Sequence, residues 1–199
     1  SASAPTPWLE VADRIGARLV RDALWHRDRC SWLGWTLIPH AGGYKPAVGT
    51  AGGDLYSGTA GIAVFLASLA AVTRDQRQRT AAIGAMRRAV ALARRRQMPV
   101  GGYSGLAGVL YAAAAVAEAL QCDEVATRTV PSLIAKLAAS RPDDRALDII
   151  DGRAGAVRSL LIAANGGLGR EGLALATAIR FGREIIDLAQ RRDDQWSWA

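Results

Sequence analysis

One short motif occurs three times in this chain, at an even spacing. Each copy is a serine or an aspartate followed by Gly-x-x-Gly, and the six glycines are Gly58 and Gly61, Gly105 and Gly108, and Gly152 and Gly155. The interval between successive copies is 47 residues. A fixed period of this length is typical of repeat architectures, in which each unit buries its apolar face only against its neighbours. We therefore expect three copies of one structural unit.

The segments around the motifs predict helices of two kinds. Almost entirely apolar segments follow the motifs, at residues 62–71, 109–120 and 156–164, and they are typical of helices buried on all sides. Amphipathic segments alternate with them, at residues 76–97, 123–140 and 170–191, and Pro131 is expected to break or restart the second. The alternation predicts an all-α protein, an α/α toroid with two concentric layers of helices, of which this chain forms about half.

The motif residues are expected to shape the starts of the inner helices. Ser57, Ser104 and Asp151 are good N-cap residues, because their side-chain oxygens can accept hydrogen bonds from the free N–H groups of a first helical turn. The glycines lack a Cβ, which lets another backbone approach closely. We expect the three helix starts to lie at one end of the inner layer.

The chain before the first motif has a different character. Residues 1–7 contain two prolines and are interpreted as a linker, and residues 8–199 as one domain. Residues 8–28 carry apolar side chains at helical spacing and predict an amphipathic helix. Residues 31–54 contain Trp32, Trp35 and several glycines, which predicts a long ordered loop with room for a short hairpin.

Charge and cysteine content bear on the binding partners and the cellular compartment of the protein. The formal net charge is +7, nearly all of it from arginine, which fits either a GC-rich genome or a basic surface for an acidic peptide or nucleic acid. Two cysteines, Cys30 and Cys122, argue against a disulfide framework and favour a reducing cytoplasm. No apolar run reaches the roughly 18 residues of a membrane span.

Five arginines form a cluster on one predicted helix: Arg87, Arg88, Arg94, Arg95 and Arg96. We interpret the cluster as a solvated helix face, because it contains no aromatic residue on which a nucleic-acid base could stack.

Three segments resemble the glycine motifs of lanthionine synthetase C-like cyclases. They are LYSGTAGIAVFL at residues 55–66, GYSGLAGVLYA at 102–112 and DIIDGRAGA at 148–156. The resemblance extends from about Leu55 onward, and it is closest to the C-terminal cyclase domain of class II lanthipeptide synthetases. It implies that residues 8–199 are the N-terminal half of such a cyclase domain. It implies an α/α toroid and a part in lanthipeptide (RiPP) antibiotic biosynthesis. In that chemistry, the thiol of a cysteine in a precursor peptide adds to a dehydrated serine or threonine and closes a thioether ring.

The resemblance also implies a zinc ion, which a complete family domain binds through two cysteines and a histidine. Part of this set lies in a Cys-His-Gly motif in the second half of the domain, and another histidine lies in a Ser-His-Gly motif. This chain contains no Cys-His and no His-Gly pair, so we assign it no metal ligand and expect no cofactor in it. His26 and Cys30 have ligand-like spacing for one helix face, but they match no family ligand. We expect the remaining half of the domain, or a second copy of the chain, to complete the fold.

Asp148 is the candidate catalytic residue. It matches the acidic residue that precedes the third glycine motif of the family, and the resemblance implies that it assists proton transfer. The alternative is a carboxylate that caps the following helix together with Asp151.

Three functions remain open for the whole chain. It is part of a lanthionine cyclase, a zinc-free peptide-binding or scaffold protein of the same fold, or an arginine-rich α/α module that binds nucleic acid, the reading that the sequence favours least. Trp196 and Trp198 near the end of the sequence are expected to lie at a seam with more chain or with a partner.

Overall fold

The computed structural model describes residues 7–95, 97–143, 146–167, 172–193 and 195–198. The helices in these residues are α1 (Pro7–Asp22), α2 (Thr59–Thr73), α3 (Gln76–Arg95), α4 (Leu106–Leu120), the π-helix η1 (Val125–Thr129), α5 (Val130–Ala139), α6 (Arg153–Asn165) and α7 (Leu173–Asp187). The three antiparallel hairpins pair β1 (Leu24–His26) with β2 (Arg29–Ser31), β3 (Leu33–His40) with β4 (Gly43–Thr50), and β5 (Gln190–Arg192) with β6 (Gln195–Ser197). The predicted all-α class is confirmed, with the hairpins as additions to a helical body.

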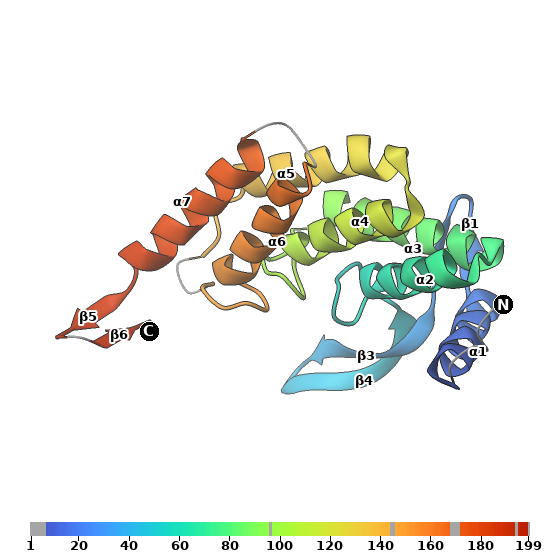
Figure 1. Cartoon of the computed structure of the whole chain (residues 1–199). Helices are drawn as coiled ribbons and strands as arrows, with labels where there is room; N and C mark the ends of the chain where they lie inside the picture. Colours follow the sequence, from blue (N-terminus) through green and yellow to red (C-terminus); the bar gives the residue numbers. More distant parts are fainter. Residues whose placement is uncertain (1–6, 96, 144–145, 168–171, 194, 199) are drawn as a thin grey trace.

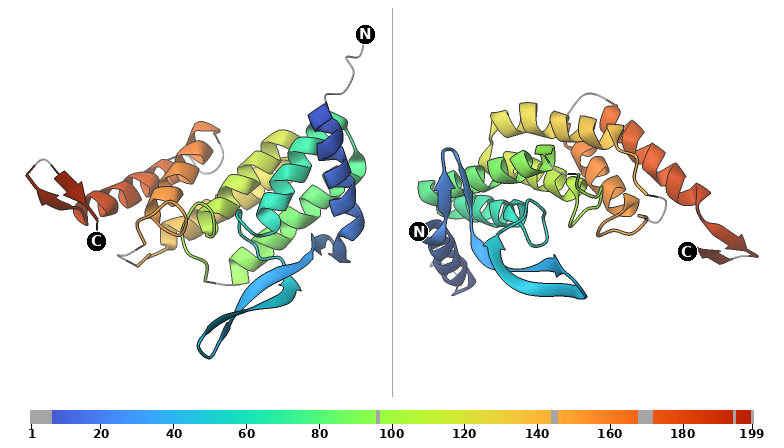
Figure 2. Two further views of the ribbon diagram at one scale, coloured as in Figure 1. Left: turned by 90° about the horizontal axis from the view of Figure 1, so that it is seen from below. Right: turned by 180° about the vertical axis from the view of Figure 1, so that it is seen from behind.

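The helices are arranged in two layers (Figure 1). In the inner layer, α4 lies between α2 and α6 and packs against both. In the outer layer, α3 packs on α2 and α4, while α5 packs on α4 and α7 packs on α6. Figure 2 shows that the row of helices is open, with α1 at one end and the β5–β6 hairpin beyond α7 at the other. The described residues thus form an arc of the expected double layer.

Burial differs among the three inner helices. Leu106, Leu110 and Val116 of α4 are at most 1% exposed, because α4 has an inner neighbour on each side. By contrast, α2 exposes Val72 and α6 exposes Leu161 and Ile162. The expectation that all three inner helices are buried on every side comes closest to α4, where Glu118 is the one exposed residue, and it is wrong for α2 and α6.

The first helix is shorter than its apolar period predicts. It ends at Asp22, and the β1–β2 hairpin follows where the sequence predicts helix to residue 28. Trp25 and Cys30 are paired across this hairpin and pack against Gly84 of α3. A Cβ at Gly84 would lie 2.8 Å from the ring of Trp25 at Cη2 and 3.1 Å from Cys30 Sγ. This docking onto α3 is a tertiary contact that the helical period does not reveal.

Residues predicted to form a long loop are mostly strand. The β3–β4 hairpin pairs eight residues on each side and projects from the body (Figure 1). Trp32, just before β3, is buried and donates its Nε1–H to Leu19 O at 2.8 Å. Trp35, within β3, is 80% exposed. Core packing therefore explains the first tryptophan and not the second.

Two smaller expectations can also be compared with the structure. Pro131 lies in the first turn of α5, directly after η1, so the α-helix restarts there as expected. Of the expected linker at residues 1–7, residues 1–6 lie outside the described residues, and Pro7 belongs to α1. None of the described helices has the length and apolar character needed to cross a membrane.

Candidate functional site

Three loops meet at one end of the inner helices and form the candidate site. They precede α2, α4 and α6, and we call them the first, second and third glycine loops: residues 52–58, 99–105 and 146–152. The backbone N–H groups of Leu55 and Tyr56 donate to Tyr103 O at 2.9 and 3.1 Å. One repeat later, the N–H groups of Tyr103 and Ser104 donate to Ile150 O at 3.1 and 3.3 Å. The loops are thus joined by successive backbone hydrogen bonds into one ladder.

The motif glycines allow this close packing of backbones. A Cβ at Gly58 would lie 2.6 Å from Asp54 O, and a Cβ at Gly108 would lie 2.6 Å from Gly102 O. The equivalent positions face backbone in the same way: Gly61, Gly105, Gly152 and Gly155. Side chains at these positions would push the loops away from the helices they precede.

The residues predicted to be N-caps each lie one position before the N-cap that the structure shows. The N-cap positions are Gly58, Gly105 and Gly152, and all three have extended backbone. The first-turn donors are satisfied by loop carbonyls instead: Thr59 N to Gly52 O at 2.8 Å, Leu106 N to Pro99 O at 2.8 Å and Arg153 N to Ala146 O at 2.9 Å. Because the folded-back loop supplies these acceptors, Ser57, Ser104 and Asp151 are not needed as caps.

Asp148 lies exposed in the third glycine loop. Its Oδ1 accepts hydrogen bonds from the N–H groups of Ile150 at 2.6 Å and Asp151 at 2.9 Å. No described residue donates to Oδ2. The interpretation of Asp148 and Asp151 as caps of α6 is wrong, because Asp148 binds N–H groups that precede the helix and Asp151 Oδ1 accepts from the hydroxyl of Ser104. Asp148 therefore closes a turn and keeps one carboxylate oxygen uncommitted within the described structure.

The first loop contains a matching carboxylate, and the second does not. Asp54 is the equivalent of Asp148 two repeats earlier, and its Oδ1 accepts from the Ser57 N–H at 2.7 Å. The equivalent residue of the second loop is Gly101, where a Cβ would collide with the backbone of Ile150 and Asp151. The sequence repeat alone could have identified this series, since Asp54, Gly101 and Asp148 share the period of the motif.

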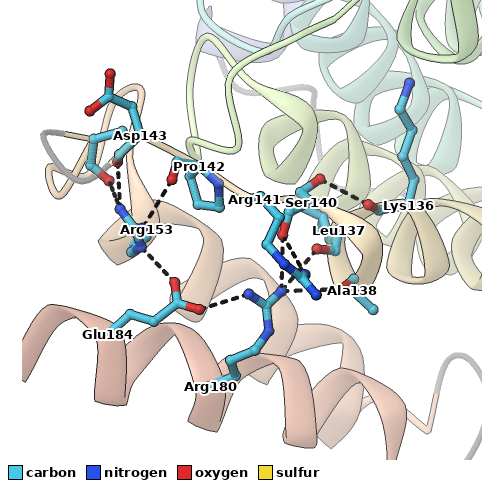
Figure 3. A network of polar contacts seen from close by, with 11 residues as sticks. Lys136, Leu137, Ala138, Ser140, Arg141, Pro142, Asp143, Arg153, Arg180 and Glu184 are labelled. Atoms are coloured by element: carbon cyan, nitrogen blue, oxygen red, sulfur yellow. Dashed lines mark hydrogen bonds and ion pairs between the residues drawn. The ribbon is translucent and has the colours of Figure 1, made fainter.

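A buried arginine anchors the third loop to the outer layer (Figure 3). Arg153 is 3% exposed, and its Nε donates to Glu184 Oε2 at 2.7 Å. Its terminal nitrogens donate to Ala146 O of the third loop at 3.4 Å, and to Asp143 O and Pro142 O just before the loop at 2.6 and 3.1 Å. Arg180 donates to Glu184 Oε1 at 2.8 Å and to carbonyls at the end of α5. Burial alone would raise the pKa of Glu184, but the two arginines outweigh it and lower that pKa. No local sequence motif predicted this network, because Arg153 and Glu184 are 31 positions apart in the chain.

The residues present do not fit the zinc site that the resemblance implies. Within the described residues, no three His, Cys, Asp or Glu side chains lie together in a way that could hold a metal ion. Cys30 Sγ donates to Ala81 O at 3.3 Å, and burial raises the pKa of its thiol to about 12, which disfavours the thiolate that binds zinc. His26 and Cys30 lie on paired strands rather than on one helix face.

The arginines expected to form a solvated face are not equivalent. Arg87 bridges Asp28 at 3.6 Å and Glu124 at 3.1 Å, whereas Arg94 and Arg95 are exposed. Arg96 lies outside the described residues.

Trp196 lies in β6 and Trp198 directly follows this strand. The β5–β6 hairpin lies beyond α7, away from the glycine loops (Figure 2). The Trp196 and Trp198 ring centroids are 6.5 Å apart, and both side chains are about half exposed. Arg191 stacks over Trp196 at 4.0 Å, and Trp198 Nε1 donates to Ile185 O at 2.8 Å. The hairpin thus keeps both rings ordered while leaving them accessible.

Comparison with known proteins agrees with the motifs. A family model described as lanthionine synthetase C-like protein matches residues 49–198, a span that includes all three glycine loops and their helices. A search of curated proteins gave no match. The match covers most of the chain and the whole ladder. This chain belongs to the lanthionine synthetase C-like family.

Proposed function

We propose that this chain forms the glycine-loop part of a cyclase that closes lanthionine rings in precursor peptides. In this reaction a cysteine sulfur bonds to the Cβ of a dehydrated serine or threonine, the carbon–carbon double bond becomes single, the thiol loses its proton and Cα gains one. The observation that carries the proposal is the position of Asp148 on a family glycine loop, with Oδ1 fixed by two N–H groups and Oδ2 uncommitted among the described residues. A fixed carboxylate with one open oxygen is suited to moving a proton.

The proposed setting is lanthipeptide biosynthesis in the cytoplasm, and both cysteines of the chain are free thiols. In a complete family domain, zinc would activate the peptide thiol. Because the described residues do not fit zinc, we assign its ligands to the remaining half of the domain.

Exposed apolar side chains support such a partner. Ile149 and Ile150 of the third loop are 47% and 53% exposed, and Leu175, Ile179 and Ile186 form an exposed stripe along α7. Apolar side chains exposed in such number on one helix and one loop usually mark an interface.

The test of function compares Asp148 with Asp54 in the enzyme encoded by the parent reading frame. Ring closure is measured by mass spectrometry, as protection of the peptide cysteine from alkylation. We expect Asp148→Asn to lower kcat at least about 100-fold with little change in KM, a typical loss for an acid–base group. Asp54→Asn removes an equivalent turn-forming carboxylate and should retain the rate. Equal rates for both variants would refute the catalytic role of Asp148.

The test of the partner is sedimentation of the purified chain. We expect association at micromolar concentration that is weakened by the double change Trp196→Ser and Trp198→Ser, because both rings are accessible beside α7. The matched control is Trp35→Ser, which alters an exposed ring on the distant β3–β4 hairpin. A stable monomer that the double change leaves unaltered would contradict the proposed seam.

The second candidate is a zinc-free peptide-binding or scaffold protein of the same family. It is favoured by one observation, that the described residues bring no metal-ligating group together. A stop codon directly after Ala199, with peptide binding but no ring closure, would support this candidate over the first. Tight, strongly salt-dependent binding to unrelated DNA duplexes would instead support the nucleic-acid alternative.

A further inference from the structure

A second site lies outside the glycine loops, between the β1–β2 hairpin and α3. A cavity of about 470 Å³ opens there, and its lining contains no residue of the three loops. The hairpin supplies one wall, including Trp25 and Ser31, and α3 supplies Arg88 and Arg95. The docking of Trp25 and Cys30 against Gly84 holds the hairpin on the helix, so the cavity is part of the fold.

Two residues that line this cavity each hold a buried donor without a partner. Ser31 is only 8% exposed, and its Oγ makes no hydrogen bond to any described residue. The Nε of Arg88 is likewise buried without an acceptor. Of the described residues, these two hold the only buried side-chain polar atoms without a partner, and both line this one cavity. Buried polar groups are nearly always paired, so an unpaired hydroxyl and an unpaired guanidinium N–H on two residues that line one cavity indicate a missing acceptor.

The charge around the cavity is positive and mostly uncompensated. Arg27 and Arg95 line it together with Arg88, and none of the three forms an ion pair with a described residue. Among the described lining residues the one carboxylate is Asp28, which is within 3.7 Å of Arg29 and 3.6 Å of Arg87. An anionic group would satisfy the buried donors and balance this charge.

We propose that this cavity binds a phosphate group, either as inorganic phosphate or as an organic phosphate monoester. A phosphate dianion offers several oxygens, enough to accept from Ser31 Oγ and Arg88 Nε and still face the guanidinium groups of Arg27 and Arg95. A carboxylate offers only two oxygens and a single charge, so it satisfies the cavity less completely. The ring of Trp25, 46% exposed, provides an apolar wall for the organic part of a monoester.

The test is isothermal titration calorimetry of the 199-residue chain at constant ionic strength, with inorganic phosphate, phenyl phosphate and acetate as ligands. We expect saturable binding of one phosphate per chain and acetate binding at least about tenfold weaker. Tighter binding of phenyl phosphate that is lost in Trp25→Ala would identify the monoester as the source, and equal binding would identify free phosphate. Preferential binding of acetate, or no saturable phosphate binding, would overturn the proposal.

Variants locate the site. Arg88→Lys keeps the charge but removes the Nε–H, and it should raise the phosphate Kd about tenfold. Ser31→Ala should raise the Kd about threefold. Arg95→Met changes an exposed rim residue without disturbing the core, so its weaker binding would support the site even if the buried variants fold poorly. The matched control is Arg94→Met, the neighbouring arginine outside this cavity, and an equal loss there would show a diffuse basic face instead.

Discussion

The second and third glycine loops carry the same motif but are held in place differently. The second loop is hydrogen-bonded on both sides, receiving bonds from Leu55 and Tyr56 and donating to Ile149 and Ile150. The third loop is hydrogen-bonded to one neighbouring loop among the described residues, and its other support is Arg153, which bonds to Ala146 O of the loop and to Glu184 on α7.

This difference explains the residues that break the repeat. The second loop lies between two other loops, and its residue at the carboxylate position is Gly101. The third loop has one neighbouring loop among the described residues, and its residue at that position is Asp148. At the first helical position, the repeat places Thr59, Leu106 and Arg153, all buried. Only the third makes a buried ion pair with the outer layer. The loops and helices that surround each copy therefore decide which residue can occupy a given position of the repeat.

The largest expected effect is at the crowded second loop. Gly101→Ala should destabilise the chain by about 3 kcal/mol, because its Cβ would collide with the backbone of the third loop, which cannot move without breaking the ladder. Urea denaturation measures the change. Gly182→Ala in α7 is the control, since a Cβ there meets nothing within 4 Å, and it should be neutral or slightly stabilising. A stable Gly101→Ala variant would mean that the two loops are not in tight contact.

The anchor of the third loop should have the next largest effect. Arg153→Met is expected to cost about 2 kcal/mol, because it leaves loop carbonyls and one oxygen of Glu184 without their buried donor, while Arg180 still pairs with the other oxygen. Arg158→Met, an exposed arginine on the same helix, should change stability by less than about 0.5 kcal/mol. Equal urea midpoints for the two variants would refute the anchoring role of Arg153.

The ion pair between Arg153 and Glu184 should also make the stability of the chain depend on pH. The pKa of Glu184 is lowered in the folded state, so its stabilising contribution is complete above its ordinary pKa of 4.5 and is lost as the pH falls through the lower, folded value. The side chain of Glu184 is 30% exposed, so we expect only about 1 kcal/mol from this source. Thermal melts from neutral to acid pH should fall less steeply for Glu184→Gln than for wild type, and parallel curves would refute the linkage.

The smallest effect on stability should come from the loop carboxylates. Asp54→Asn and Asp148→Asn each weaken hydrogen bonds within one turn, and we expect each to cost about 0.5 kcal/mol. Closely matched values would confirm that the carboxylates play the same structural part in the first and third loops. A much larger loss for Asp148→Asn would mean that the third loop depends on its carboxylate for folding, and the comparison of activities would then need correction for stability.

Several features were predictable because they depend on spacing alone. The period of 47 residues predicted three equivalent helix starts at one end, and the backbone hydrogen bonds between the loops confirm this. Alternation of apolar and amphipathic segments predicted two helix layers. The family resemblance also rested on local motifs, and the match at residues 49–198 confirms it.

Other features were decided by contacts between distant residues. The hairpin at Trp25 and Cys30 replaces predicted helix because these side chains pack on Gly84, which lies 59 and 54 positions later in the chain. Ser57, Ser104 and Asp151 do not cap the helices, because loop carbonyls accept the hydrogen bonds of the first-turn N–H groups.

The sequence by itself determined the repeat, the helical class, the family and the position of Asp148 before the third motif. Only the tertiary structure decided which neighbours surround each copy, and hence which helix is buried, which loop is open and which arginines are paired. The physical reason is that helix period and turn chemistry act within a few residues. Burial, ion pairing and the unmatched donors at Ser31 and Arg88 depend on surfaces that meet only after folding.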